Sequence, residues 1–501
     1  MGATVNSQRF DVAVVGAGIG GLAAAALLAR AGRSVILVDR SSRAGGACQG
    51  LVHDGWRFEV GATFLSGFGP GGPLATLCRR LGITLSVKEC DPVFQVALPR
   101  HRLSFWGDPN AWWREVRREF PKDDAVWRAL WAELNDLAVQ RERILQELPP
   151  LPPEGWGARL RVWRVLKSRL FSPLSFKGGA ALKRALDTPF RAAMLRHGLG
   201  GESQRVLEAA LWFLLVRDPD ECSTLEAAVA LLQTRHGVVD VPGGVSGLVD
   251  ALVESFHRDG GQLRLETPAT RFLQEGGRIV GLKIGGGETI RAGWVVANVP
   301  PGDLAGTLVP PSRGWLRRRP TPSGPWHPTL IAQAAVLALP DGAVPSELSG
   351  HCLVVPDPRR PAREENLVVV RLSPTWDQGQ GEDGPRRFTV GRFVAPRPQD
   401  EDASLLPDLL EALDLIVPGV AEGMVSHRAL TPAALGEMWG RPGAAVRYAA
   451  ASPEWLGCRG FPHRLDWPGL LAVGEWTYPG RLICQVVEGA MRVVDRITGT
   501  G

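Results

Sequence analysis

The chain has 501 residues, 45% of them hydrophobic and 22% charged, a composition typical of folded globular proteins rather than disordered or fibrous ones. Its length predicts two domains rather than one core. The formal net charge of +5 is mild for this length and the basic residues form no long run, so we expect no nucleic-acid partner.

The seven cysteines lie far apart and form no Cys-x-x-Cys pair, which argues against a disulfide framework and against a zinc site. No metal is therefore expected. The N-terminal sequence MGATVNSQRF lacks the basic and apolar regions of a secretion signal. The sequence also contains no run of about 18 apolar residues, the length needed to span a membrane. We expect a cytoplasmic protein that does not cross a membrane but can lie on one.

The first elements expected along the chain are a strand, a helix and a second strand, at residues 10–15, 22–31 and 34–38. Gly16, Gly18 and Gly21 follow the first strand in a Gly-x-Gly-x-x-Gly pattern, with Gly20 inside it. Such glycines allow a tight turn in which a pyrophosphate approaches backbone N–H groups at a helix start. The pattern predicts a Rossmann-type dinucleotide site.

Asp39 ends the second strand, where its carboxylate can accept a hydrogen bond from a ribose hydroxyl. Arg40 follows it, and Arg43, Gly45 and Gly46 complete an Asp-x-x-x-Arg-x-Gly-Gly pattern. Arg43 can pair with the second phosphate, and the glycine pair lets the backbone approach the ligand. This extension indicates FAD-binding proteins of the glutathione-reductase-like type rather than plain NAD dehydrogenases.

Residues 156–177 predict an amphipathic helix that carries basic side chains beside tryptophan, leucine and phenylalanine. Its apolar residues at helical spacing are Leu160, Trp163, Leu166 and Leu170, and its basic residues are Arg159, Arg161, Arg164, Lys167 and Arg169. Such a face binds anionic lipid surfaces. A helix packed on the core with a solvated basic face has the same pattern, so both interpretations stay open.

The second half of the chain is expected to rejoin the nucleotide-binding sheet. Residues 241–272 predict a glycine turn, an amphipathic helix and a strand, and 293–300 predict a buried strand. The last block, residues 470–497, predicts a strand, a glycine turn and a closing helix. A helix start beside a strand end is a natural ligand site.

The expected fold is therefore α/β, with a Rossmann-type, glutathione-reductase-like FAD-binding domain and an interleaved, mixed α+β substrate domain. The segments assigned to the FAD-binding domain are 1–90, 236–305 and 466–501. The segments assigned to the substrate domain are 91–235 and 306–465.

Together these fragments resemble the phytoene desaturase, carotene isomerase and amine oxidase superfamily of flavoproteins. The resemblance rests on GAGIGGLAAAALLARAG, VDRSSRAGG, GWRFEVGAT, VPGGVSGLVDAL and VGEWTYPG. Within the superfamily, the stretches GWRFEVGATFLSGFGPGG, CDPVFQVALP, WGDPNAWWREVRREFP and TYPG are most similar to C-3',4' carotenoid desaturases. The two ends of the chain carry this resemblance, and the middle carries little.

The resemblance implies roles for residues near the C-terminus. Glu475, after Gly474, matches the acid that hydrogen-bonds the ribityl chain, although the carotenoid branch more often has Asp there and amine oxidases have Glu. Gly480 and the helix after it would stabilise negative charge on the reduced flavin ring. The resemblance also implies backbone contacts to FAD at Gly61, Ala62 and Ala269.

The activity implied by the resemblance is FAD-dependent desaturation of a carotenoid or similar apolar polyene, by hydride transfer to flavin N5. No catalytic side chain is assigned. Three alternatives stay open: a carotenoid cis–trans isomerase that uses reduced FAD, a flavin amine oxidase, which Glu475 favours, and a non-enzymatic prenyl- or lipid-binding protein of the same fold. Asp39, Arg43 and the glycine pair argue against the last. A lipid-soluble substrate also favours peripheral contact with an anionic membrane.

Overall fold

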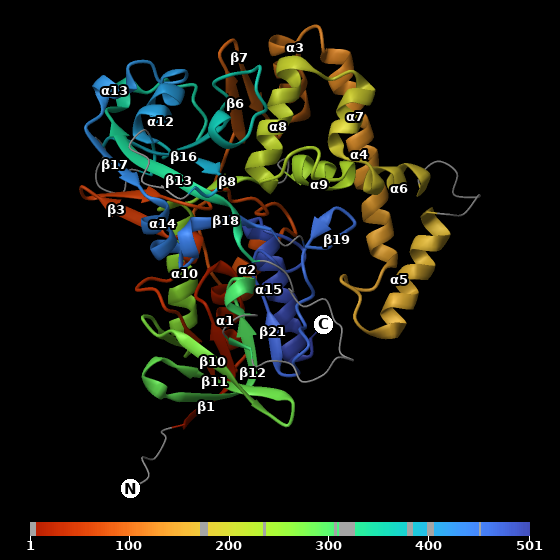
Figure 1. Ribbon diagram of the computed structural model, residues 1–501, viewed down its shortest axis with the longest axis vertical. Coiled ribbons are helices and arrows are strands. Elements are labelled where there is room, and N and C mark those ends of the chain that lie inside the picture. Colours follow the sequence, from red (N-terminus) through yellow and green to blue (C-terminus); the bar gives the residue numbers. More distant parts are fainter. Residues whose placement is uncertain are drawn as a thin grey trace.

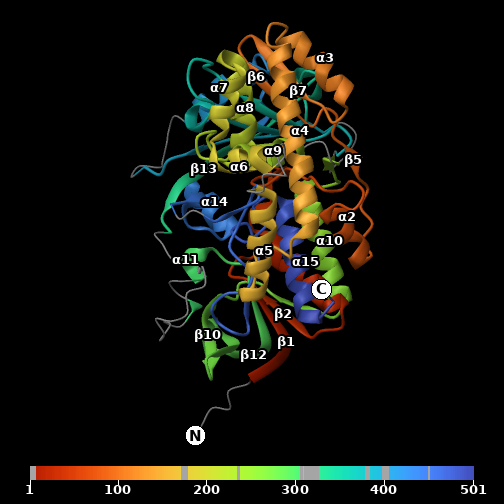
Figure 2. The same cartoon turned by 90° about the vertical axis from the view of Figure 1, so that its right-hand side faces the viewer.

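Two sheets organise the molecule, and each is built from stretches of chain that lie far apart in the sequence (Figure 1). The structure is a computed structural model that describes residues 7–170, 179–233, 237–304, 308–309, 326–377, 384–397, 405–449 and 452–500. The two sheets lie one beyond the other along the longest axis, and a group of helices stands beside the second sheet (Figures 1 and 2). Within the described ranges, no helix combines the length and the apolar character needed to cross a bilayer.

The first sheet follows the order β10–β11–β12–β1–β2–β9, with β21 paired to β12. Its strands are β1 (Ser7–Val15), β2 (Val35–Val38), β9 (Gln262–Arg264), β10 (Ala269–Glu275), β11 (Arg278–Ile284), β12 (Thr289–Ala297) and β21 (Leu470–Ala472). The pairs β12–β1, β1–β2, β2–β9 and β12–β21 are parallel, whereas β10, β11 and β12 pair antiparallel. Val12 and Val14 of β1 pack on one face and Ala13 and Val15 on the other, as expected of a parallel strand buried on both sides.

Helices α1 (Ile19–Arg30), α10 (Gly244–Arg258) and α15 (Ile483–Thr498) share one core with this sheet. Helix α2 (Pro73–Leu81) packs against α1 and α15. The run Ala23–Ala26 in α1 is completely buried, and its small side chains let the neighbouring helices approach closely. The predicted strand–helix–strand is thus β1–α1–β2, but the helix begins at Ile19 because two of the turn glycines belong to its first turn.

The second sheet follows the order β17–β13–β16–β15–β14–β6–β7, with β18 paired to β13. Its strands are β6 (Phe94–Leu98), β7 (His101–Phe105), β13 (Pro328–Leu339), β14 (His351–Val354), β15 (Val368–Leu372), β16 (Arg386–Val394), β17 (Ser426–Leu430) and β18 (Ala445–Tyr448). All its pairs are antiparallel except β14–β6. Helix α12 (Leu405–Asp414) packs on one face with α13 (Val420–Gly423), and α14 (Pro432–Trp439) packs on the other.

The helices beside this sheet build a core rich in tryptophan, which includes Trp112, Trp127 and Trp131. The helices of this core are α3 (Pro109–Glu119), α4 (Asp124–Glu147), α7 (Phe190–His197), α8 (Gly201–Leu215) and α9 (Thr224–Gln233). Helices α5 (Gly155–Leu170) and α6 (Gly179–Asp187) pack with α4 in a separate core. Helix α5 lies on the outside of the molecule, alongside α4 (Figure 2). It confirms a helix in the predicted stretch 156–177, and residues 171–177 of that stretch lie outside the described residues.

Short paired strands connect the two sheets: β3 (Gly50–His53) with β4 (Trp56–Glu59), β5 (Lys88–Glu89) with β8 (Val239–Asp240), and β19 (Glu454–Trp455) with β20 (Cys458–Arg459). Arg371 of β15 forms ion pairs with Glu59 at 2.6 Å and with Asp240 at 2.7 Å, and all three side chains are largely buried. A short helix, α11 (Pro301–Asp303), follows β12.

The strands of the first sheet fall in the segments 1–90, 236–305 and 466–501, and those of the second in 91–235 and 306–465. The domain boundaries themselves stay a prediction.

Candidate functional site

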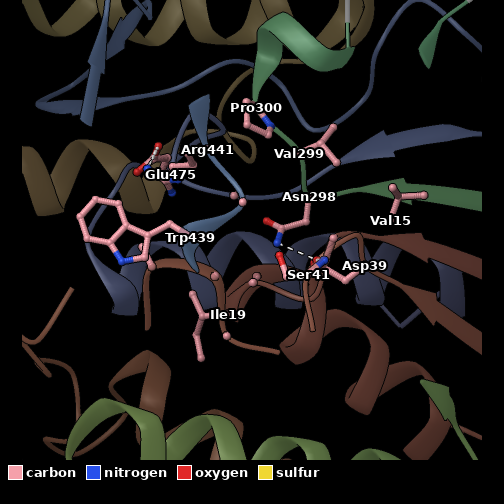
Figure 3. A pocket seen from close by; sticks show the side chains of 18 of the residues that line it. Val15, Ile19, Asp39, Ser41, Asn298, Val299, Pro300, Trp439, Arg441 and Glu475 are labelled. Atoms are coloured by element: carbon pink, nitrogen blue, oxygen red, sulfur yellow. Dashed lines mark hydrogen bonds and ion pairs between the residues drawn. The ribbon is translucent and has the colours of Figure 1, made fainter. Parts of the chain in front are cut away.

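The turn between β1 and α1 forms one wall of a cavity (Figure 3). Gly16 has a φ of +98°, and a Cβ there would lie 2.2 Å from the carbonyl oxygen of Asn298, so only glycine fits. A Cβ on Gly21 would lie 2.0 Å from the Gly16 oxygen. Helix α1 begins after Gly18 without a side-chain cap, which leaves its first N–H groups available to an anion.

Asp39 stands at the end of β2, on the same wall. Its Oδ2 accepts a hydrogen bond from the Ala17 N–H at 2.5 Å, and its Oδ1 accepts one from the Ser41 N–H at 2.7 Å. Each carboxylate oxygen can accept a further hydrogen bond, so Asp39 can hold the turn and a ligand hydroxyl together. The Gly45 N–H donates to the Ala17 oxygen at 2.8 Å, which brings the loop with Gly46 beside the turn.

A segment attached to the second sheet closes the cavity from another side. Trp439 ends α14, and Gly440 and Arg441 follow it into the cavity lining (Figure 3). The Arg40 guanidinium donates to the Gly440 oxygen and lies 3.3 Å from Asp303. The indole Nε1 of Trp439 is buried, and no described residue forms a hydrogen bond with it. Trp439 lines the cavity, so this N–H can donate to an acceptor on a bound molecule.

The loop between β21 and α15 forms the end of the cavity that lies away from Asp39 (Figure 3). Glu475, directly after Gly474, forms an ion pair with Arg441 at 2.8 Å. Arg481 lines this end too, and burial lowers the pKa of its guanidinium. The cavity therefore has a hydroxyl acceptor, Asp39, at one end and two arginines, Arg441 and Arg481, at the other.

The cavity together with the open solvent at its mouth contains about 1350 Å³ of space that no protein atom occupies. The predicted site residues that line it are Gly16, Gly18, Gly20, Asp39, Arg40, Gly45, Gly46, Ala62, Ala269, Gly474 and Glu475. Those that do not are Gly21, Arg43, Gly61 and Gly480.

The predicted residues that do not line the cavity are either packed behind its wall or exposed on the surface. A Cβ on Gly61 would lie 2.3 Å from the Ala47 oxygen, and one on Gly480 would lie 2.6 Å from Oε1 of Gln485, so both glycines permit packing behind the wall. Arg43 is exposed. The cations that do line the cavity are Arg40, Arg441 and Arg481.

Sequence reasoning missed several lining residues, namely Ser41, Asn298, Trp439, Arg441 and Arg481. Asn298 could have been predicted from the sequence, because it directly follows β12 and the carboxyl ends of parallel strands meet at the ligand crevice. Its Nδ2 donates to the Gly16 oxygen at 3.3 Å. Trp439 and Arg441 carry no local signal, since they reach the cavity only through the fold of the second sheet.

Comparison with known families decides the identity of this site. The family described as flavin containing amine oxidoreductase matches residues 19–334, more than half of the chain. The chain belongs to this family of flavin-dependent oxidoreductases. It is an enzyme of that class, and its cofactor is FAD.

Individual relatives of this flavin oxidoreductase come from carotenoid metabolism. A neurosporene-forming phytoene desaturase of Cereibacter sphaeroides is 25% identical over 95% of this chain and 92% of its own length. The chloroplastic prolycopene isomerase of Daucus carota is 23% identical over 60% of this chain and 48% of its own length. Among solved structures, an oxidoreductase from Methanosarcina mazei covers 97% of this chain and 100% of its own, with a TM-score of 0.64 and 18% identity. At that identity the structural match shows the fold alone.

The residues present fit FAD. Asp39 would hold the adenosine ribose, the uncapped start of α1 would hold the pyrophosphate, and the lone indole N–H of Trp439 would find its acceptor. Ala269 lines the cavity where the resemblance expects the adenine, and Ala62 where it expects the flavin ring. These contacts stay predictions for this chain.

Proposed function

We propose that this flavin oxidoreductase introduces double bonds into a carotenoid or similar apolar polyene. The observation that carries the proposal is the match to a phytoene desaturase over nearly the whole of both chains. Desaturation requires a hydride acceptor and an apolar substrate site rather than a protein nucleophile. The C-3',4' position of the resemblance stays a prediction.

The cavity lining suits that chemistry. Within the described residues it contains neither histidine nor lysine, and its cysteine, Cys48, is no nucleophile because burial raises the pKa of the thiol to about 12. FAD, when bound, supplies the acceptor for a hydride from an allylic carbon. Asp39 and the α1 turn would position the cofactor, and Trp439 at the end of α14 lines the cavity beside it.

Phe64, two residues after the lining residue Ala62, packs edge-to-face on Phe213, with the ring centroids 5.3 Å apart. Phe94 lies 6.5 Å from Phe64 and 5.8 Å from Phe213. Phe64 and Phe94 are buried and pack in the tryptophan-rich core, so these rings form an apolar layer behind the cavity rather than its lining.

Two other activities compete with desaturation. The relationship to a prolycopene isomerase favours cis–trans isomerisation with reduced FAD. Amine oxidation is favoured by the family description, but the glutamate expected to support it, Glu475, is tied to Arg441, and Arg481 adds a second positive charge nearby. A protonated amine would meet repulsion at this end of the cavity.

The experiment is expression of the chain in cells that accumulate phytoene or neurosporene, followed by mass analysis of the pigments. A desaturase yields products lighter by pairs of hydrogen atoms, and Asp39→Ala yields fewer of them. Products of unchanged mass but altered retention would establish isomerisation instead. Unchanged pigments with a flavin-loaded protein would overturn both.

We also propose that α5 docks on an anionic membrane, from which a water-insoluble substrate would enter. Trp156, Leu160 and Trp163 are 88%, 45% and 56% exposed, on a helix whose opposite face is buried through Val162. Such exposure of tryptophan is unusual on a solvated surface and typical of a lipid-facing helix.

Basic residues share the exposed side of α5. Arg159, Arg161, Arg164 and Lys167 are exposed, and the Lys167 ammonium lies 4.8 Å from the centre of the Trp163 ring. The side chain of Arg169, the fifth basic residue of the predicted face, lies outside the described part of the chain. Each basic residue near an anionic surface contributes about 1 kcal/mol before salt screening.

Co-sedimentation with vesicles of phosphatidylcholine and phosphatidylserine tests the docking. Replacement of the four exposed basic residues of α5 by Gln should reduce binding at low salt at least tenfold and leave bound flavin intact. The matched control replaces four exposed arginines elsewhere, Arg33, Arg117, Arg271 and Arg428, by Gln. Equal binding by the two variants would refute α5 as the docking surface.

A further inference from the structure

One arginine at the end of the cavity away from Asp39 forms no ion pair with a carboxylate in the described part of the chain. The Arg481 Nη1 donates to the Leu215 oxygen at 3.3 Å, and its Nη2 donates to the Val446 oxygen at 3.2 Å. Among the described residues, no Asp or Glu oxygen comes within 4.0 Å of this guanidinium. Two backbone carbonyls thus fix its position without neutralising its charge.

The neighbouring arginines differ in this respect. Three of them each have a carboxylate: Arg441 pairs with Glu475 at 2.8 Å, Arg447 with Glu221 at 2.6 Å, and Arg217 with Glu226 at 3.7 Å. The Arg481 side chain is partly buried, and this burial lowers the pKa of its guanidinium. Because a partly buried cation without a paired carboxylate is stabilised by a nearby anion, an anionic group on a molecule in the cavity that Arg481 lines would neutralise its charge.

The position of Arg481 indicates which part of a bound FAD would carry the negative charge. Arg481 interacts electrostatically with Glu475 and Arg441, and Figure 3 places those two residues away from Asp39. With the ribose held by Asp39 and the pyrophosphate by the start of α1, the flavin end of a bound FAD would lie toward Arg481. A flavin ring gains negative charge on two-electron reduction, and a fixed cation beside it favours the reduced form.

We propose that Arg481 is the counter-charge of the reduced flavin ring and raises the midpoint potential of the bound cofactor. A higher potential strengthens FAD as an acceptor of hydride from a carbon–hydrogen bond. The inference concerns the cofactor alone, so it holds whichever compound donates the hydride.

The test compares the flavin-loaded protein with Arg481→Met and Arg481→Lys, by spectroelectrochemical titration of the midpoint potential. We expect Arg481→Met to weaken binding of reduced FAD relative to oxidised FAD at least tenfold, a shift of about 30 mV to a more negative potential for a two-electron couple. Arg481→Lys keeps the charge and should restore most of the shift. Arg447→Met, which removes a nearby arginine with its own carboxylate, is the matched control and should leave the potential unchanged.

An unchanged potential in Arg481→Met would overturn the proposal. Equal losses of affinity for oxidised FAD and for ADP, at unchanged potential, would also overturn it, because Arg481 would then be a counter-charge of the pyrophosphate. Should Arg481→Met fail to hold FAD, Arg481→Gln takes its place, since an amide can still donate to a carbonyl. A more negative midpoint potential in Arg481→Gln than in Arg481→Lys supports the proposal, and equal potentials in the two variants refute it.

Discussion

Replacing Asp39 by Ala probes the dinucleotide end of the cavity, because this one carboxylate has two tasks. It accepts two backbone hydrogen bonds, at 2.5 and 2.7 Å, that hold the turn before α1 and the start of the next loop. Its remaining lone pairs face the cavity that it lines. The substitution therefore removes support from the turn and an acceptor from the ribose.

The expected loss of FAD affinity is about 1–3 kcal/mol, the usual cost of leaving a polar group without its partner, which is roughly 5- to 150-fold in Kd. Isothermal titration of FAD into the apo-protein measures it. Urea unfolding of the same apo-protein separates the weakened turn from the lost ligand contact.

A matched control lies at the other end of the same two strands. Asp11 accepts hydrogen bonds from the backbone N–H and the hydroxyl of Ser34, both at 2.9 Å, far from the cavity lining. Asp11→Ala should lower the stability of the apo-protein without changing the affinity for FAD. The reasoning fails if Asp39→Ala binds FAD as the wild type does, or if both variants lose affinity equally.

The remaining predictions concern buried charges. Arg371→Met leaves the buried carboxylates of Glu59 and Asp240 without their cation. Urea unfolding should show a loss of about 3–5 kcal/mol of unfolding free energy. A loss below about 1 kcal/mol would show that these three side chains are not buried in solution. Burial lowers the pKa of His351 to about 3, so below pH ~6.5 the unfolded state binds a proton that the folded state refuses, and stability falls as the pH drops toward 3. Between pH 7 and 5 the wild type should therefore lose about 2 kcal/mol more than His351→Phe, whereas the exposed His257→Asn should lose as much as the wild type.

The local parts of the site could be predicted from the sequence. The glycines, the strand end at Asp39 and the Gly45–Gly46 pair follow one another within a single strand–helix–strand unit, whose geometry depends on neighbouring residues. Local pattern was sufficient there because the backbone itself builds the binding surface. Gly474 and Glu475 were expected only from the family resemblance, and they lie just beyond the buried strand β21.

The rest of the site depends on contacts between distant segments. Arg441 reaches Glu475 only because β13 and β18 place the end of α14 over the cavity, and no pattern around Arg441 indicates this. Arg43 has the spacing of a phosphate ligand, but the loop leaves its side chain exposed and outside the cavity lining. Spacing alone therefore does not place this side chain. In α5, periodicity predicted the helix, but only the packing of Val162 shows that the tryptophans face outward.

The most direct test of the account is a single turnover without oxygen. Purified, FAD-loaded protein is mixed anaerobically with phytoene or neurosporene in phosphatidylserine-containing vesicles, while flavin absorbance is followed and the polyene is recovered for mass analysis. The account predicts that oxidised flavin bleaches and that each equivalent lost yields one polyene lighter by two hydrogen atoms. Flavin that stays oxidised in contact with these polyenes, but is bleached by an amine, would contradict it.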